Sequence, residues 1–317
     1  MGPGVSTLSK PAAARPGADF DALVAREAAR VDRALEAVTG ELVHGVPEHL
    51  AEPMRYALGT RGKRLRPLLC VAAYRALRGG DDAPDVVYRL ACALEIVHTY
   101  SLVHDDLPSM DDDDLRRGRP TVHRVYGVAP AIVAGAALLP AAAVLLDREG
   151  IALGLAPAER GRLVAELCGA AGAVGMVGGQ LLDLEGEGAE LDAAGLERIH
   201  RAKTGALLVA SLRVGALAAR GTAEQLHGLT RYGEALGLAF QIVDDVLDVV
   251  QHSHALGKTA GKDEAAGKAT YPALFGVDGA RALAARRVDE AVASLRAVGI
   301  ASPALEMSAR FVLERES

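Results

Sequence analysis

Apolar residues recur at intervals of three and four along most of the chain, the spacing that places side chains on one face of an α-helix. The first predicted helix begins near Asp19 or Asp21 and ends at Gly40, and its apolar face consists of Leu23, Val24, Ala28, Val31, Leu35 and Val38. No segment alternates steadily between apolar and polar residues, and no repeat of fixed period is found. The pattern predicts an all-α protein.

Turn-forming residues divide the rest of the chain into further helices. The sequence predicts helices over 47–59, 68–77 and 86–103, and later breaks at 186–195, near Gly221 and at 252–270. No internal linker separates these helices, so we expect a single-domain helical bundle over residues 18–317. Residues 1–17 are rich in Gly, Pro and Ala, and we expect a disordered tail there.

Composition supports closely packed helices. Hydrophobic residues make up 50% of the 317 residues but aromatic residues only 3%, and Trp is absent, so Ala, Leu and Val must fill the core. The formal net charge of -6 gives no general attraction to nucleic acid, and we expect no such partner. Cys70, Cys92 and Cys168 lack the spacing of a zinc site and are interpreted as reduced core residues of a cytoplasmic protein.

One stretch, residues 127–146, is uncharged and long enough to cross a bilayer. It consists mostly of Ala and Gly, which insert weakly, and Pro130 and Pro140 interrupt it. We therefore predict a helix buried on all sides in a soluble core, kinked at Pro140, and no membrane span.

Two clusters of aspartates stand out among apolar neighbours. Asp244 and Asp248 are four residues apart and share a helix face, where two carboxylates are costly to bury unless a cation lies between them. In the first cluster, Pro108 should end the helix so that Asp111 folds back toward Asp105. Residues 112–114 suit a solvated face.

Carboxylates grouped without His or Cys favour a hard cation, and Mg²⁺ prefers one or two carboxylates together with phosphate oxygens. Calcium is the weaker alternative, because no EF-hand spacing is present. Basic segments that could hold a phosphate are GKRLRP at 62–67, RRGRP at 116–120, KTG at 203–205 and GKTAGKDEAAGK at 257–268. Neither GxxxxGK[ST] nor GxGxxG after a strand occurs, so a nucleotide-binding loop is excluded.

Six segments follow one another along the chain: GKRLRP, HTYSLVHDDLPSMDDDDLRRGRPTVH, GGQLLDLEGE, KTGALL, FQIVDDVLDV and LGKTAGKDEAAGKATYPALFG. In this order they resemble the trans-isoprenyl diphosphate synthases, or polyprenyl synthetases, and most of all the bacterial farnesyl diphosphate synthases. The resemblance implies a polyprenyl synthetase domain over residues 18–317, folded as a helical bundle around a deep central cavity, and a homodimer.

The resemblance also implies the roles of the site residues. A first motif of Asp105, Asp106 and Asp111 would face a second motif of Asp244, Asp245 and Asp248, and both would hold Mg²⁺ ions that clamp an allylic diphosphate. The allylic diphosphate would be bound by Arg116, Lys203 and Lys258, with Thr204 and Gln241 beside them. Isopentenyl diphosphate would be bound by Lys63, Arg66, His98 and Arg117.

The implied reaction condenses isopentenyl diphosphate with dimethylallyl or geranyl diphosphate. Tyr100, five residues before Asp105, would form the floor of the cavity. In the family an aromatic residue there, with the two-residue insertion in this motif, accompanies the fifteen-carbon product, so farnesyl diphosphate is expected and geranylgeranyl diphosphate is the alternative. A terpene cyclase and a catalytically silent partner subunit are less favoured, because aromatic residues are only 3% of the chain and both motifs are complete.

Overall fold

The computed structural model describes residues 18–80, 82–186, 188, 191–254 and 269–315. The expected N-terminal tail, residues 1–17, and Lys258 lie outside the described residues. The described part is a single all-α domain, so the predicted fold class is confirmed.

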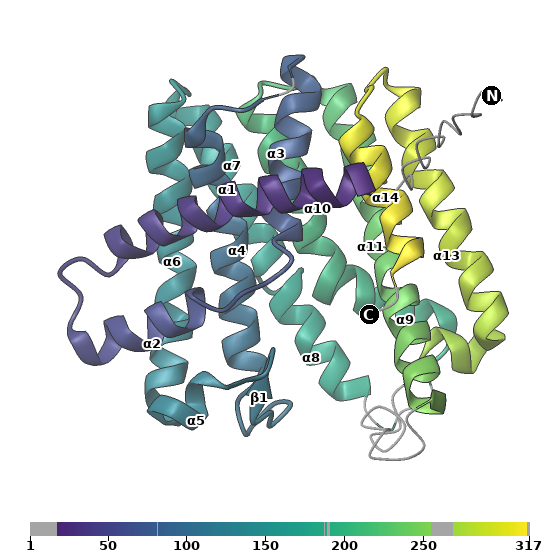
Figure 1. The fold of residues 1–317 in the computed structure, drawn as a ribbon, viewed down its shortest axis with the longest axis horizontal. Coiled ribbons are helices and arrows are strands. Elements are labelled where there is room, and N and C mark those ends of the chain that lie inside the picture. Colours follow the sequence, from purple (N-terminus) through teal and green to yellow (C-terminus); the bar gives the residue numbers. More distant parts are fainter. Residues whose placement is uncertain (1–17, 81, 187, 189–190, 255–268, 316–317) are drawn as a thin grey trace, which may run out of the picture.

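Helices account for almost all of the regular structure (Figure 1). The first half of the chain contains α1 (Ala18–Leu42), α2 (Glu48–Leu58), α3 (Leu65–Arg78), α4 (Asp85–Asp105), α5 (Val122–Tyr126) and α6 (Val128–Ala152). The second half contains α7 (Pro157–Ala171), α8 (Met176–Gly186), α9 (Ala193–His200), the π-helical turn η1 (Arg201–Gly205), α10 (Ala206–Ala218), α11 (Ala223–His254), α13 (Tyr271–Ala297) and α14 (Pro303–Glu314). The described strands are β1 (Leu115–Arg116) and β2 (Arg119–Pro120), which form an antiparallel hairpin.

Helix α4 lies at the centre of the bundle and packs against α1, α3, α6 and α10. It is buried on nearly every face because residues 86–97, VVYRLACALEIV, are mostly apolar. The charged exceptions, Arg89 and Glu95, pair with Glu149 and Arg64. Helix α4 ends at Asp105, and in Figure 1 the β1–β2 hairpin lies at the same end of the bundle as the C-terminal end of α11. The fold thus brings both aspartate segments to one end of the molecule.

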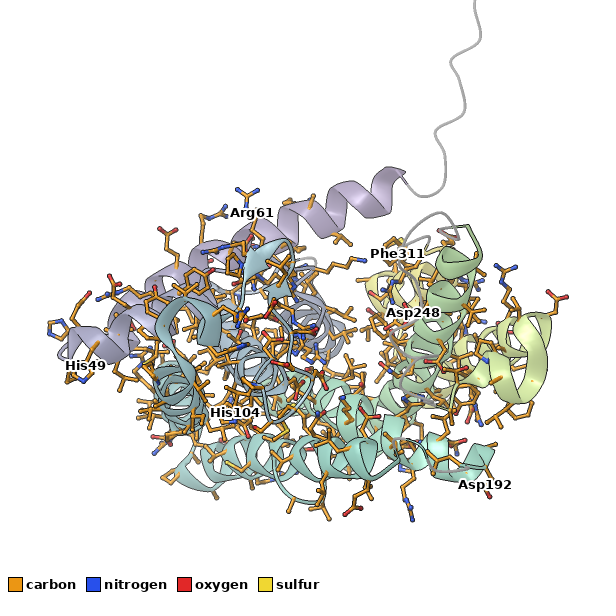
Figure 2. The ribbon with its side chains drawn as sticks, turned by 90° about the horizontal axis from the view of Figure 1, so that it is seen from below. His49, Arg61, His104, Asp192, Asp248 and Phe311 are labelled. Carbon is orange, nitrogen blue, oxygen red and sulfur yellow. The ribbon has the colours of Figure 1, made fainter. Side chains whose placement is uncertain are left out.

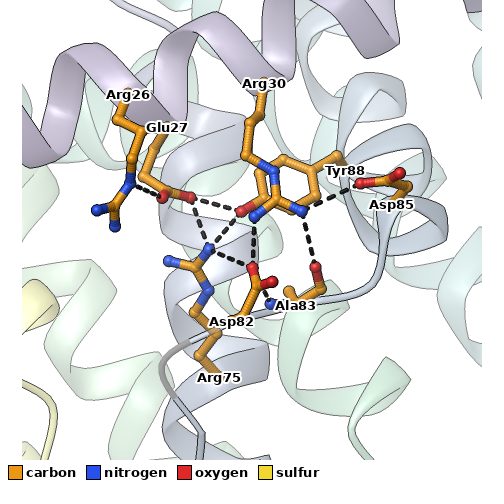
Figure 3. Close-up of polar contacts among 8 residues, drawn as sticks. All are labelled: Arg26, Glu27, Arg30, Arg75, Asp82, Ala83, Asp85 and Tyr88. Carbon is orange, nitrogen blue, oxygen red and sulfur yellow. Dashed lines mark hydrogen bonds and ion pairs between the residues drawn. The ribbon is translucent and has the colours of Figure 1, made fainter.

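A buried polar network fastens α1 to α3 and α4 (Figure 3). The carboxylate of Glu27, 5% exposed, accepts hydrogen bonds from the Tyr88 hydroxyl at 2.5 Å and from Arg75 Nη2 at 2.7 Å. Arg30 lies over the Tyr88 ring, 4.0 Å from its centroid, and donates to Asp85. Burial alone would raise the pKa of Glu27, but Tyr88 and Arg75 outweigh it and hold the pKa below its usual value.

Two local expectations, the end of the first helix and the burial of Cys168, were wrong. Helix α1 continues past Gly40 to Leu42, because a glycine inside an exposed helical turn costs only about 1 kcal/mol. The helix break near Pro140 is not a full interruption, since α6 runs continuously from Val128 to Ala152, and the kink expected at Pro140 stays a prediction. Cys168 is an exposed free cysteine, whereas Cys70 and Cys92 are buried.

Helix α6 is also not buried on all sides, as the sequence had suggested. Its outer face exposes Val128, Ile132, Val133, Val144 and Ile151. By length and composition alone, three helical stretches could cross a membrane: Asp85–Asp105, Val128–Ala152 and Pro157–Gly186. The absence of a membrane span therefore stays a prediction.

The pKa of Glu27 predicts how the network responds to acid. Because the folded-state pKa is lowered, the ionised carboxylate stabilises the fold above its unfolded-state pKa, and this contribution is lost as the pH falls through the folded-state pKa. We expect Glu27→Gln to lower the free energy of unfolding by roughly 2 kcal/mol at pH 7 and by less below about pH 4. Urea unfolding across this pH range measures the difference, with Glu36→Gln on the exposed face of α1 as control. A pH-independent loss would show that the charge of Glu27 is unimportant.

Candidate active site

The chain reverses direction directly after the first aspartates. Helix α4 ends at Asp105, and the Asp111 backbone N–H donates to the Asp105 carbonyl oxygen at 2.9 Å. The Asp112 N–H donates to the Leu107 carbonyl oxygen at 3.1 Å, which closes a second loop around Pro108. The predicted helix end and the return of Asp111 toward Asp105 are both confirmed.

The three aspartates of this first motif have different surroundings. Asp106 is 3% exposed and accepts a hydrogen bond from Arg116 Nε at 2.8 Å, yet burial still raises its pKa. Burial also raises the pKa of Asp105 to about 6, opposed by Lys203 and reinforced by the carboxylate of Asp111. Since Arg116 already neutralises Asp106, Asp105 and Asp111 are the better candidates for metal ligands.

The second motif lies on α11. Asp244 Oδ1 pairs with Arg315 Nη1 at 2.7 Å, and burial raises the pKa of Asp244 although Arg315 opposes it. Asp245 Oδ2 accepts the backbone N–H of Tyr271 at 2.9 Å and so anchors the start of α13. Asp248 is exposed, so the expectation of a buried face was wrong for this residue.

Figure 2 shows Asp248 and His104, which directly precedes Asp105, on different sides of the bundle. That the two motifs face one another across a substrate stays a prediction.

The donor set suits Mg²⁺. Within the described ranges, no three His, Cys, Asp or Glu side chains lie close enough to hold a metal by themselves. The donors of both motifs are nevertheless all carboxylates, and the pKa of Asp105 is raised mainly by burial, with a further contribution from the charge of Asp111. An ion that uses one or two carboxylates and completes its shell with water and phosphate oxygens fits this arrangement.

A cationic region lies beside the first motif. Burial lowers the pKa of Arg66 to about 10, and its Nε has no hydrogen-bond partner in the described structure. Burial, together with Arg66 and Arg117, holds the pKa of His98 well below its usual value, so the ring is neutral at pH 7. The buried Nδ1 of His98 also lacks a partner among the described residues. Buried nitrogens without hydrogen-bond partners, surrounded by several cations, favour the binding of an anionic ligand.

Arg117 and Lys63 lie at the edge of this region. Arg117 Nη1 donates to the Arg61 carbonyl oxygen at 2.7 Å, and its guanidinium covers Gly62, where a Cβ would come within 2.9 Å of the Arg117 Cζ. The glycine of GKRLRP thus leaves the space that the Arg117 guanidinium occupies. Lys63 is exposed as a whole, but partial burial of its charged group, together with nearby Arg315, lowers its pKa, and Asp244 opposes this shift. Lys63 is thus on the side of the second motif.

Arg64, which was not assigned a role from the sequence, fixes the GKRLRP segment. It has a left-handed backbone with φ of 51° and a buried side chain. Its guanidinium pairs with Glu95 at 2.7 Å and Asp32 at 2.8 Å and donates to the Thr60 carbonyl oxygen at 3.0 Å. Nothing in the sequence distinguishes this inward-facing arginine from its basic neighbours.

Lys203 and Thr204 belong to the π-helical turn η1. Lys203 Nζ pairs with Asp183 Oδ2 at 2.7 Å, which joins the KTG segment to α8. A Cβ on Gly179 would lie 2.5 Å from the Lys203 Cα, so this glycine allows α8 and η1 to touch. Asp183 was overlooked as a site residue, although it lies within the recognised GGQLLDLEGE segment. Gln241 contacts the Nδ1 of His200 at 3.3 Å.

A cavity of 330 Å³ connects several of these residues. The predicted site residues that line it are Arg66, His98, Tyr100, Asp105, Lys203 and Thr204. Apolar walls come from Met176, Val177, Leu181 and Leu184. Asp106, Arg116 and Arg117 line a small neighbouring pocket, and Lys63, Gln241 and the second motif lie outside both. The cavity has a charged end beside Asp105 and an apolar body, as an amphiphilic substrate requires.

The sequence profile of the polyprenyl synthetase family matches residues 47–298. The chain belongs to this family. Farnesyl diphosphate synthase of Geobacillus stearothermophilus is 46% identical over 273 residues, which are 85% of this chain and 90% of that protein. Dimethylallyltranstransferase of Fischerella ambigua is 47% identical over 272 residues, which are 84% of this chain and 75% of that protein. Geranylgeranyl pyrophosphate synthase 9 of Arabidopsis thaliana is 46% identical over 276 residues, covering 86% and 75%.

Solved structures agree with this assignment. An FPP/GFPP synthase from Zymomonas mobilis superimposes with a TM-score of 0.79 at 38% identity, covering 93% of this chain and 99% of that one. A geranyltransferase from Legionella pneumophila gives a TM-score of 0.81 at 31% identity, covering 95% and 99%. The family, the fold and the prenyltransferase class expected from the motifs are confirmed. The relatives are named for both farnesyl and geranylgeranyl products, so they leave the product length open.

The raised pKa of Asp105 predicts a conflict between stability and function. Its folded-state pKa of about 6 exceeds its usual 3.8, so the folded protein loses stability as the pH rises between these values. We expect Asp105→Asn to stabilise the metal-free protein by about 2 kcal/mol at pH 7, and to have little effect below about pH 3.5, while removing most prenyltransferase activity.

Urea unfolding in a chelator at both pH values measures this effect. Asp114→Asn, at an exposed position of the same acidic run, is the control. A variant no more stable than the unmodified protein at pH 7 would show that Asp105 is not destabilising.

Proposed function

We propose that this protein is a Mg²⁺-dependent prenyltransferase that condenses isopentenyl diphosphate with dimethylallyl and then geranyl diphosphate to give (2E,6E)-farnesyl diphosphate. The observation that carries the proposal is the 330 Å³ cavity, in which Asp105 and Lys203 stand at the charged end while apolar side chains and Tyr100 line the body.

The first step is ionisation of the allylic carbon–oxygen bond, which leaves negative charge on the departing diphosphate. Lys203, Thr204 and Arg116 are proposed to hold this group, and Lys258 with Gln241 to complete the shell. Preorganised cations next to a developing charge lower the barrier without reorganisation during the reaction. Mg²⁺ bound through Asp105 and Asp111 of the first motif and Asp244 and Asp248 of the second would neutralise further diphosphate charge.

The second step is attack of the isopentenyl double bond on the allylic cation. Arg66, His98, Arg117 and Lys63 are proposed to bind the isopentenyl diphosphate. His98 is neutral at pH 7, so it can offer one N–H donor without adding charge. The departing diphosphate is proposed to take the proton that is then lost, so no protein nucleophile is needed. The apolar cavity wall keeps water away from the cation.

Product length is proposed to depend on Tyr100, which is 9% exposed and lines the cavity one turn before His104. A bulky ring at this position supports the fifteen-carbon product. Geranylgeranyl diphosphate is the second candidate, because relatives 46% identical to this chain carry that name.

We also propose a homodimer in the cytoplasm, with no nucleic-acid partner and no membrane span. Its support is apolar surface on neighbouring elements: Val144 on α6 is 65% exposed, and Val174, between α7 and α8, is 92% exposed. Apolar patches of this kind mark protein interfaces in soluble proteins.

The deciding experiment incubates the purified protein with Mg²⁺, isopentenyl diphosphate and one of dimethylallyl, geranyl or farnesyl diphosphate. Chain lengths are read after dephosphorylation. Farnesol from the first two starters and no product from farnesyl diphosphate supports the proposal. Geranylgeraniol from all three starters would support the proposed prenyltransferase reaction but refute the proposed fifteen-carbon product. A hydrocarbon from farnesyl diphosphate alone would favour a cyclase, and turnover only with an added partner would favour a silent subunit.

Replacing Tyr100 tests the proposed floor. We expect Tyr100→Ala to lengthen the product, with the ratio of twenty-carbon to fifteen-carbon alcohol rising about tenfold or more, because a smaller side chain admits another isoprene unit. Tyr126→Ala, at a ring outside the 330 Å³ cavity, should leave the ratio unchanged. An unaltered ratio in Tyr100→Ala would refute Tyr100 as the floor.

A further inference from the structure

The ring of Tyr100 is supported by His104, one helical turn later on α4. The two ring centroids are 4.6 Å apart, with planes at 66°, an edge-to-face arrangement. Both rings line the 330 Å³ cavity, and Asp105 follows His104 directly. The surface beneath the charged end of the cavity is therefore made by a pair of rings.

His104 is held in turn by α6. Its Nε2–H donates to the Ile132 carbonyl oxygen at 3.1 Å. Gly135, buried on α6, leaves the space that the imidazole occupies, since a Cβ there would lie 2.5 Å from the His104 Cδ2. Gly135 is not among the residues with positive φ, and Ala would favour the helix by roughly 1 kcal/mol, so the close approach of His104 is what accounts for glycine here.

We infer that Gly135 and His104 are positioning residues that set product length. Gly135 lets the imidazole lie against α6, and the imidazole fixes the position of the Tyr100 ring. This inference rests on the proposed function, because it concerns the length of the prenyl chain that the cavity accepts.

The two positions predict opposite changes. In Gly135→Ala the new methyl group pushes the imidazole away from α6 and into the cavity that it lines, so less chain fits and shorter products accumulate. In His104→Ala the support of Tyr100 is lost and the cavity widens, so longer products accumulate. A general loss of folding would not move product length in two directions.

The experiment supplies isopentenyl diphosphate, Mg²⁺ and dimethylallyl diphosphate and compares alcohol products at equal conversion of starter. We expect the ratio of ten-carbon to fifteen-carbon product to rise about tenfold in Gly135→Ala. The ratio of twenty-carbon to fifteen-carbon product should rise by about the same factor in His104→Ala. Gly161→Ala on α7, where an added Cβ meets nothing within 4 Å, is the matched control and should give the unmodified product pattern.

The double variant Gly135→Ala/His104→Ala makes the test specific. Without the imidazole there is nothing for the new methyl group to displace, so the double variant should show the product pattern of His104→Ala.

Several results would overturn the inference. These are an unchanged product ratio in a Gly135→Ala protein with the unmodified melting temperature, a shift in the same direction in both single variants, and additive effects in the double variant. Gly135 is not among the residues proposed to hold either diphosphate, so Gly135→Ala decides the matter even where His104→Ala has no turnover. If the unmodified protein makes farnesol and the variants have the same product ratios, only the positioning role is refuted. If the unmodified protein makes no prenyl product, the proposed function and this inference are refuted together.

Discussion

The pairing of cations with carboxylates between different segments of the chain is the interaction on which the rest of the site depends. An isolated charge is expensive to remove from water, so a bundle that gathers basic residues near its core must supply acidic partners. The pairs in this structure are Arg64 with Glu95, Arg116 with Asp106, Lys203 with Asp183 and Arg315 with Asp244. Each pair joins segments that are distant in sequence or separated by a turn. The ion pairs therefore also hold in place the segments whose basic residues are proposed to bind diphosphate.

These pairs differ from the groups that lack partners. Arg64 is enclosed by Glu95, Asp32 and a carbonyl oxygen, which suits it to hold the GKRLRP segment in place. Arg66 and His98, by contrast, keep buried nitrogens without partners in the described structure. A structure tolerates such groups where a ligand can satisfy them. Within the GKRLRP segment, Arg64 therefore holds the loop in place, whereas Arg66 is suited to bind a ligand.

What could be predicted from the sequence was mainly local. The return of Asp111 to Asp105 agrees with the break expected at Pro108, because proline lacks a backbone N–H and disfavours helical angles at the residue before it. Pro140 shows that a proline does not end every helix. The motifs identified the family because they are likewise local, being short runs of residues. The inward orientation of Arg64, the Lys203–Asp183 pair and the exposure of Asp248 depend on where distant helices come to lie, and no local pattern records that. Helix α6 was misjudged because an apolar composition does not tell a helix buried by its own chain from one with an exposed face.

Helix α4 combines the two ends of the proposed reaction in six consecutive residues. Asp105 closes the helix at the charged end, His104 directly precedes it, and Tyr100 lies one turn before His104, with all three side chains lining the cavity. Because a helix rises a fixed 1.5 Å per residue, the distance between the carboxylate and the rings is set by the backbone and not by loop motion. The constraint has a cost in stability, since the buried end of this helix carries a carboxylate whose pKa is raised to about 6. Contacts with α6 then become important, because a rigid spacing on α4 can limit chain length only if the rings themselves cannot rotate away.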